Sequence, residues 1–309
     1  MRDRSPGQPV PEAVLPTPSS AAASGRTTIR VSLPSRSVLT LMIAAVVFGL
    51  AAWGSSAAHA ATTTVKIPAE SQYVAIGSSY AAGQSIATQL PVCGRSTNNY
   101  PHLVAKALHL KLTDVTCGAA LTANAIDTPE GDQPPQIDAV TKDTKLVTIT
   151  IGGNDVQYSP TALACGADSV TCLTATPPTQ LDSEFAALPG ALTTLIDMVR
   201  SKAPGTKIVF VPYVRIVPPT TCPALNFSPA AASLVGGIGK RLEKVFVDVV
   251  KKTGVIMADP YAVGADHGPC AGSQAWIAGH QATNGFPYHP TAAGHVAMAH
   301  LVDHALGDG

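Results

Sequence analysis

A chain of 309 residues is long enough for one large domain or two small ones, and its 46% hydrophobic content is typical of globular proteins. The 20 basic and 20 acidic residues cancel to a formal net charge of +0, which excludes the basic surface of a nucleic-acid-binding protein. This composition also argues against disorder along the whole chain.

The first 60 residues predict an export signal rather than folded structure. Residues 1–36 are rich in Pro, Ser and Ala and contain five arginines and two acidic residues. The uncharged stretch from Val38 to Trp53 has 16 residues, which is short for a bilayer span of about 20 residues. The Ala-His-Ala tripeptide at 58–60 then fits a signal-peptidase site, so we predict cleavage after about Ala60. An uncleaved N-terminal anchor is the alternative.

Cleavage there would leave 249 of the 309 residues, and we predict that residues 61–309 form one domain. Because residues 1–60 contain five basic and two acidic residues, the remainder has 15 basic and 18 acidic residues and a net charge of −3. The sequence shows no internal repeat and no second linker. The expected product is therefore a single-domain, secreted protein.

All six cysteines lie after the predicted cleavage site. An even number in an exported chain indicates disulfides, although six cysteines allow 15 pairings. A metal site is the rival interpretation, but the sequence lacks a C-x-x-C pair or a Cys/His cluster with ligand spacing. We therefore expect disulfides and no metal. Sequential pairing is the simplest because it closes local loops, and it would join Cys93 to Cys117, Cys165 to Cys172 and Cys222 to Cys270.

From residue 73 onward, strand-like and helix-like segments alternate. Short apolar runs at 73–76, 146–151, 207–211 and 255–258 end at turns, as buried strands of a parallel sheet do. Between them, apolar residues repeat at helical spacing over 192–199 and 234–249. Strand, helix and strand in repetition predict right-handed crossovers and a three-layer α/β/α domain around a central parallel sheet.

Polar residues of the kinds found in catalytic sites follow these predicted strands. In such a sheet, ligands bind beyond the carboxyl ends of the strands. Ser78 and Ser79 come after the first run, Asn154 comes after the second, and His289 precedes Pro290 near the chain end. Taken singly, each signal is weak, because a Ser before a helix is usually a cap and a Gly-Gly-Asn is usually a turn. Together at one sheet edge, they indicate a site.

Four segments carry a more specific pattern. Residues 73–83 read YVAIGSSYAAG, 116–119 read TCGA, 148–156 read TITIGGNDV, and 288–295 read YHPTAAGH. They resemble the first, second, third and fifth sequence blocks of the SGNH (GDSL-type) hydrolases, and most closely those of secreted actinobacterial lipases and esterases with three disulfides. The resemblance implies a flavodoxin-like α/β/α SGNH-hydrolase fold and the hydrolysis of carboxylic esters.

The resemblance also implies roles for four residues. Ser79 would be the nucleophile and His289 the base that takes its proton. The backbone N–H groups of Ser79 and Gly118, with the side-chain amide of Asn154, would form the oxyanion hole. This mechanism needs no metal or organic cofactor. We expect a monomer that acts on a small-molecule or lipid ester, with no nucleic acid and no obligate protein partner.

Two positions depart from the family pattern. Ser78 stands where the family has the Asp of Gly-Asp-Ser, and we prefer Ser79 as the nucleophile because it holds the third position of that block. Phe286 stands where many members have an Asp three residues before the His. We therefore expect a Ser79–His289 dyad in which the backbone carbonyl of Phe286 orients the imidazole.

Several alternatives stay open at this point. Asp259 or Asp266 would supply an acid to the histidine through space. A catalytically inactive SGNH-fold binding protein is the alternative to an enzyme, because of Ser78 and the missing acid. A carbohydrate O-acetyl esterase, a phospholipase or a thioesterase would use the same site. The loops that would shape the pocket have no pattern that separates these substrates, and they lie at 120–135, 157–182 and 213–230.

Overall fold

The computed structural model describes residues 66–175, 178–283 and 285–307. The predicted signal peptide and its cleavage site near Ala60 lie outside these residues, so the division into 1–60 and 61–309 stays a prediction. Within the described ranges, no helix combines the length and the hydropathy that a membrane crossing requires.

A parallel sheet forms the centre of the described structure. Its five strands are β1 (Gln72–Gly77), β2 (Lys111–Asp114), β3 (Thr144–Thr150), β4 (Lys207–Phe210) and β5 (Ile256–Met257). They lie in the order β2-β1-β3-β4-β5, and all neighbours pair in parallel. This is the flavodoxin-like order, in which the strand order reverses between β1 and β3 and ligands bind at that point.

The four strands predicted from apolar runs are all present, whereas β2 was not predicted. Lys111–Asp114 lies at the sheet edge and alternates between exposed and half-buried positions, so it has no apolar run to reveal it. It extends the sheet on the far side of β1.

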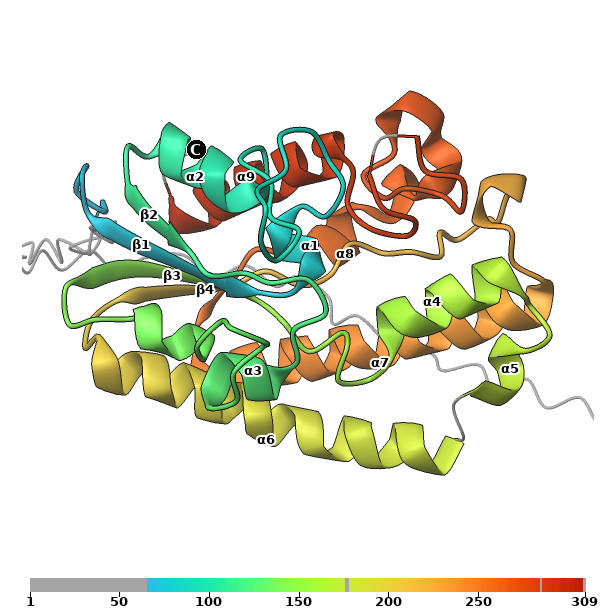
Figure 1. Cartoon of the computed structure of the whole chain (residues 1–309), viewed down its shortest axis with the longest axis horizontal. Coiled ribbons are helices and arrows are strands. Elements are labelled where there is room, and N and C mark those ends of the chain that lie inside the picture. Colours follow the sequence, from blue (N-terminus) through green and yellow to red (C-terminus); the bar gives the residue numbers. More distant parts are fainter. Residues whose placement is uncertain (1–65, 176–177, 284, 308–309) are drawn as a thin grey trace, which may run out of the picture. The chain divides into compact units, whose positions relative to one another are not determined.

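Helices cover both faces of this sheet (Figure 1). On one face, α2 (Tyr100–Ala107) packs against α9 (Ala292–Leu306). On the other face lie α3 (Thr122–Ile126), α6 (Pro178–Lys202) and α7 (Pro229–Thr253). The helical patterns predicted at 192–199 and 234–249 fall in α6 and α7, and the predicted three-layer α/β/α fold is confirmed.

The other helices connect these layers. They are α1 (Ser79–Ala82), α4 (Tyr158–Ala167), α5 (Cys172–Ala175) and α8 (Pro260–Val263), with 3-10 turns at Gln136–Ala139, Pro223–Leu225, Ala265–His267 and Pro269–Gln274.

The register between β1 and β3 brings the ends of the two strands together. Gly77 pairs with Thr150, and the Ser78 N–H donates to the Thr150 carbonyl at 2.9 Å. A Cβ at Gly77 would lie 2.7 Å from the Cβ of Ala81 and 2.8 Å from the Thr150 carbonyl oxygen, so a side chain does not fit. The segments that follow β1 and β3 therefore begin side by side.

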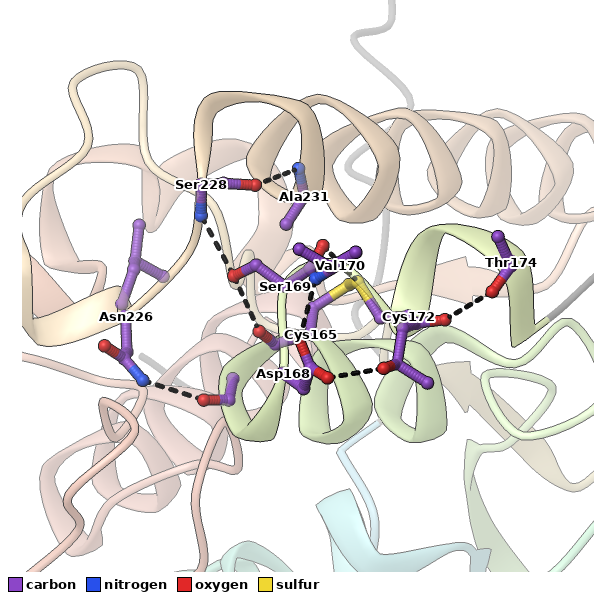
Figure 2. Close-up of a disulfide and its surroundings, with 12 residues drawn as sticks. Cys165, Asp168, Ser169, Val170, Cys172, Thr174, Asn226, Ser228 and Ala231 are labelled. Carbon is purple, nitrogen blue, oxygen red and sulfur yellow. Dashed lines mark hydrogen bonds between the residues drawn. A yellow bond between two sulfur atoms is a disulfide. The ribbon is translucent and has the colours of Figure 1, made fainter.

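The sequential pairing of the cysteines is confirmed. Figure 2 shows one bridge, which joins α4 to α5; beside it, the Ser169 hydroxyl accepts the Ser228 N–H at 3.2 Å and so ties this turn to the start of α7. The other bridges hold the loop after α1 to the segment after β2 and join two loops near α8. The pairs are Cys93–Cys117, Cys165–Cys172 and Cys222–Cys270.

Removal of the Cys222–Cys270 bridge is expected to cost more stability than removal of the Cys165–Cys172 bridge. The two bonds span 48 and 7 positions of sequence, and a longer closed loop restricts the unfolded chain more. We expect losses of about 4 kcal/mol for Cys222→Ser/Cys270→Ser and about 2 kcal/mol for Cys165→Ser/Cys172→Ser. Urea unfolding of both double variants beside the wild type measures the difference, and equal losses would contradict the loop-length argument.

Candidate active site

Ser79 and His289, which are 210 residues apart in sequence, meet at the carboxyl edge of the sheet. Ser79 begins α1, and its Oγ lies 2.8 Å from Nε2 of His289. The other ring nitrogen, Nδ1, lies 2.9 Å from the Pro287 carbonyl oxygen. A carbonyl oxygen can only accept, so Nδ1 carries the proton and Nε2 of the neutral ring accepts from the Ser79 hydroxyl. A general base requires this arrangement.

The prediction that the Phe286 carbonyl orients the histidine is wrong. That carbonyl accepts the backbone N–H of His289 at 3.1 Å, so it closes a turn instead. Tyr288 has a left-handed backbone with φ of 59° and folds the Pro287 carbonyl back toward the ring. The orienting group is thus a carbonyl, as expected, but one residue further along the chain.

An acid supplied through space is also not found. The Asp259 carboxylate accepts the N–H groups of Tyr261 and Ala262, both at 2.9 Å, and so caps α8. Neither Asp259 nor Asp266 has a hydrogen bond or ion pair with His289, and in the part of the chain that the structure describes no other carboxylate does.

The imidazole of His289 lies in an apolar environment. Its ring centroid is 4.9 Å from that of Tyr80 and 5.0 Å from that of Phe286, and the residue is only 3% exposed. Burial lowers the pKa of His289 from its ordinary value of 6.5 to about 4, and the hydrogen bond to the Pro287 carbonyl opposes this effect in part. His289 is therefore neutral, and able to accept a proton, except in acid.

Hydrogen bonds around Tyr288 stabilise its strained backbone and so keep the neighbouring His289 in place. A left-handed conformation costs a residue other than Gly on the order of 1–3 kcal/mol, so the surroundings must stabilise it. The Tyr288 N–H donates to the Ala278 carbonyl at 3.2 Å, and its hydroxyl donates to the Leu225 carbonyl at 2.7 Å. Its own carbonyl accepts the Tyr80 hydroxyl at 2.5 Å, which connects the histidine segment directly to α1.

Two of the three expected oxyanion donors are available. The Asn154 amide is buried and donates one N–H to the Ala120 carbonyl at 3.1 Å, which leaves its second N–H for a ligand. In the described residues, the Ser79 N–H has no acceptor. The expectation for Gly118 is wrong, because its N–H donates to the Cys93 carbonyl at 2.9 Å. The Cys93–Cys117 disulfide brings that carbonyl into place.

Asp155 fixes the loop that carries Asn154. Its carboxylate accepts the Thr122 N–H at 3.1 Å and the Thr122 hydroxyl at 2.5 Å, which ties the end of β3 to the start of α3. Burial raises the pKa of Asp155, and the hydrogen bonds from Thr122 oppose this effect in part. From the sequence alone, Asp155 is expected only to cap the turn after Asn154, because its partner Thr122 lies 33 residues away.

A cavity of about 720 Å³ lies on the other side of the histidine segment. Residues 277–283, Pro223, Ala224 and the first turn of α9 contribute to its lining, whereas Ser79, Asn154 and His289 do not. Its lining contacts the histidine segment: the Ala278 N–H donates to the His289 carbonyl at 2.9 Å, and the ring centroid of His280 lies 6.2 Å from that of Tyr288. Within the described ranges, no group of three or more His, Cys, Asp or Glu side chains is arranged to hold a metal ion.

A Ser–His pair at the switch point of a flavodoxin-like sheet is typical of serine hydrolases with an α/β/α fold. Residues 75–297 match the GDSL-like Lipase/Acylhydrolase family, and the chain belongs to this family. The resemblance to SGNH (GDSL-type) hydrolases is thereby confirmed, as is the predicted class, an enzyme that hydrolyses carboxylic esters.

Individual relatives agree with this assignment. The chain is 34% identical over 293 residues to Lipase 2 of Streptomyces coelicolor, an alignment that covers 88% of this chain and 97% of that protein. A phospholipase A1 from Streptomyces albidoflavus superposes with a TM-score of 0.65 at 26% identity, over 77% of this chain and 100% of that one. An extracellular lipase from Streptomyces rimosus gives 0.64 at 26% identity, over 76% and 99%.

The pKa of His289 predicts an acid limit of activity well below that of an ordinary histidine. The base must be neutral, so kcat/KM for p-nitrophenyl acetate should rise with pH through about 4 and become level above about pH 5. A series of rate measurements from about pH 3 to 8 gives this profile, and a half-maximal rate near the ordinary value of 6.5 would contradict it.

Unfolding must be separated from protonation in this experiment. Because the folded pKa of His289 is depressed, its contribution to stability is present above pH 6.5 and is lost as the pH falls toward about 4. The circular dichroism of each sample is therefore recorded at its assay pH, and only a native spectrum throughout the acid limb assigns that limb to His289.

Proposed function

We propose that this protein is a secreted esterase or lipase that cleaves carboxylic esters through an acyl-enzyme on Ser79. The observation that carries the proposal is the 2.8 Å contact between Ser79 Oγ and His289 Nε2, with Nδ1 held by a carbonyl. His289 takes the hydroxyl proton as Oγ attacks the ester carbonyl and then gives it to the departing alcohol. Water, activated by the same base, then hydrolyses the acyl-enzyme.

The negative charge of the tetrahedral intermediate needs donors that are already in place. The Ser79 N–H and the second N–H of Asn154 fit this role, because neither has to give up another acceptor. The Ala120 carbonyl holds the Asn154 amide, so the donor is oriented before substrate binds. Gly118 would join only by giving up the Cys93 carbonyl.

A carbonyl in place of a carboxylate weakens one part of this mechanism. It fixes the tautomer of His289 but stabilises the transient imidazolium less than a charged group would. The flanking rings of Tyr80 and Phe286 exclude water from the imidazole, and this burial also disfavours its charged form.

The relatives favour lipid esters as substrates. The two solved proteins are a phospholipase A1 and an extracellular lipase, and three disulfides are typical of exported proteins. These observations support a site of action outside the cell. We propose in addition that the enzyme is released by cleavage near Ala60 and acts as a monomer without an obligate partner. An inactive binding protein would have no need for the formed Ser–His contact, which speaks against that alternative.

Substitution of the dyad is the decisive test of this function. Ser79→Ala and His289→Ala should each lower kcat for p-nitrophenyl acetate and longer acyl esters by about 10⁴-fold or more. The nucleophile and its base act as a unit, so loss of either one removes most of the rate that both provide. Ser78→Ala should keep a turnover that both variants lose. Rates across acyl chain lengths separate a lipase from a short-chain esterase. If the wild type hydrolyses no ester, the proposal fails; if only Ser78→Ala is inactive, the nucleophile is Ser78.

Asn154→Ala tests the oxyanion donor. Loss of one such donor elsewhere lowers kcat about 10²- to 10³-fold, and we expect the same here with little change in KM, because the bond forms in the transition state. Asn226→Ala is a matched control, since its amide also donates to a backbone carbonyl, that of Gly166 at 2.8 Å. Equal kcat values for the two variants would remove Asn154 from the mechanism.

A further inference from the structure

Ser78 makes a buried contact that the mechanism above does not use. Its Oγ lies 2.7 Å from the hydroxyl of Tyr213, 135 residues further along the chain. Ser78 is 0% exposed and Tyr213 is 2% exposed, so both hydroxyls have left water to form this bond. Because water does not reach either hydroxyl, loss of this bond costs more stability than loss of a hydrogen bond at the surface.

Tyr213 also lies directly against the residue before Asn154. β4 is next to β3 in the sheet, and Tyr213 follows the end of β4, so its ring reaches the turn after β3. A Cβ at Gly153 would lie 2.4 Å from Cε1 of Tyr213 and 2.9 Å from its hydroxyl oxygen. Only a glycine permits this approach. One tyrosine therefore contacts both the residue before the nucleophile and the residue before the oxyanion donor.

The ring of Tyr213 is fixed on its other sides by aromatic contacts. Its centroid lies 6.0 Å from that of Phe246 on α7, in a stacked arrangement, and 4.4 Å from that of Tyr80. Tyr80 in turn contacts the imidazole of His289 and donates to the Tyr288 carbonyl. The ring has little freedom to move, and it bridges the helical layer and the catalytic residues.

We propose that Tyr213 is a positioning residue, which sets the separation of Ser79 and Asn154 through its hydroxyl bond to Ser78 and its contact with Gly153. The inference rests on the proposed function, because it requires both residues to act on one ester carbonyl. Oxyanion donors must lie about 2.7–3.1 Å from the developing charge. A misplacement of about 1 Å can cost 10²-fold in rate.

Tyr213 does not itself transfer a proton. Burial raises the pKa of its phenol, and hydrogen bonds from the Ser78 side chain and the Gly153 backbone oppose this only in part. The phenol therefore stays protonated wherever the enzyme works. A variant without the hydroxyl should change the height of the pH profile and leave its acid limb in place.

Tyr213→Phe tests the proposal, because it removes the hydroxyl and keeps the ring. We expect kcat to fall about 10- to 100-fold with KM changed less than about 2-fold and the acid limb unmoved. Tyr73→Phe is the matched control: its hydroxyl is equally buried and lies 2.8 Å from the Thr148 hydroxyl, and among the described residues it forms no hydrogen bond with Ser79, Asn154 or His289. That variant should keep the wild-type kcat.

A double variant tests whether the hydroxyls of Ser78 and Tyr213 act through the single hydrogen bond between them. If they do, Ser78→Ala/Tyr213→Phe has the same kcat as Tyr213→Phe alone, because the second substitution removes nothing further. Multiplied losses would overturn the proposal, as would a kcat for Tyr213→Phe equal to that of Tyr73→Phe. Thermal unfolding of all variants shows that each is folded at the assay temperature.

Ser79→Ala in the same series separates this inference from the function on which it rests. An inactive Ser79→Ala beside a fully active Tyr213→Phe overturns the positioning role alone. A Ser79→Ala that keeps its activity overturns both.

Discussion

The pairing of Gly77 with Thr150 is the contact on which the rest of the site depends. It brings the ends of β1 and β3 together at the point where the strand order reverses, so the nucleophile and the oxyanion donor start from adjacent backbone positions. The close approach of α1 leaves no room for a Cβ at Gly77. This register already brings Ser79 and Asn154 close together. The bond of the Asn154 amide to Ala120 and that of the Tyr213 hydroxyl to Ser78 then adjust the distance between them.

The surroundings of His289 make it a weaker base and widen the pH range in which it is neutral. Two aromatic rings and near-complete burial keep water from His289, and its pKa falls to about 4. A carboxylate partner would raise that pKa, but it would itself have to lose its hydration in an apolar environment. The Pro287 carbonyl fixes the ring without adding a charge. The result is a weaker base that stays neutral over a wide pH range.

Local sequence patterns predicted four of the five strands, the helices α6 and α7 and the reacting side chains, because these depend on residue type and spacing. Apolar runs revealed β1, β3, β4 and β5, and the family blocks identified Ser79 and His289. The errors concern backbone groups. The orienting role was assigned to Phe286 because it holds the position of the family's Asp, and nothing in the sequence shows that a left-handed Tyr288 turns the Pro287 carbonyl toward the ring instead. Gly118 was assigned an oxyanion role from the family's second block. Its bond to the Cys93 carbonyl could not be predicted, because the position of that carbonyl depends on the folded disulfide loop.

The contact that Ser78 makes also could not be predicted from the sequence. In sequence it is a departure from the family's Asp, and taken alone it suggests a damaged site. In the fold it faces a tyrosine 135 residues away, in a place that water does not reach. A carboxylate there would accept the Tyr213 hydroxyl, but an unpaired buried charge costs far more than a buried hydroxyl. It would also place a negative charge close to the carbonyl oxygen that becomes an anion during the reaction. A serine makes the same link without that charge, so the departure is compatible with an intact site.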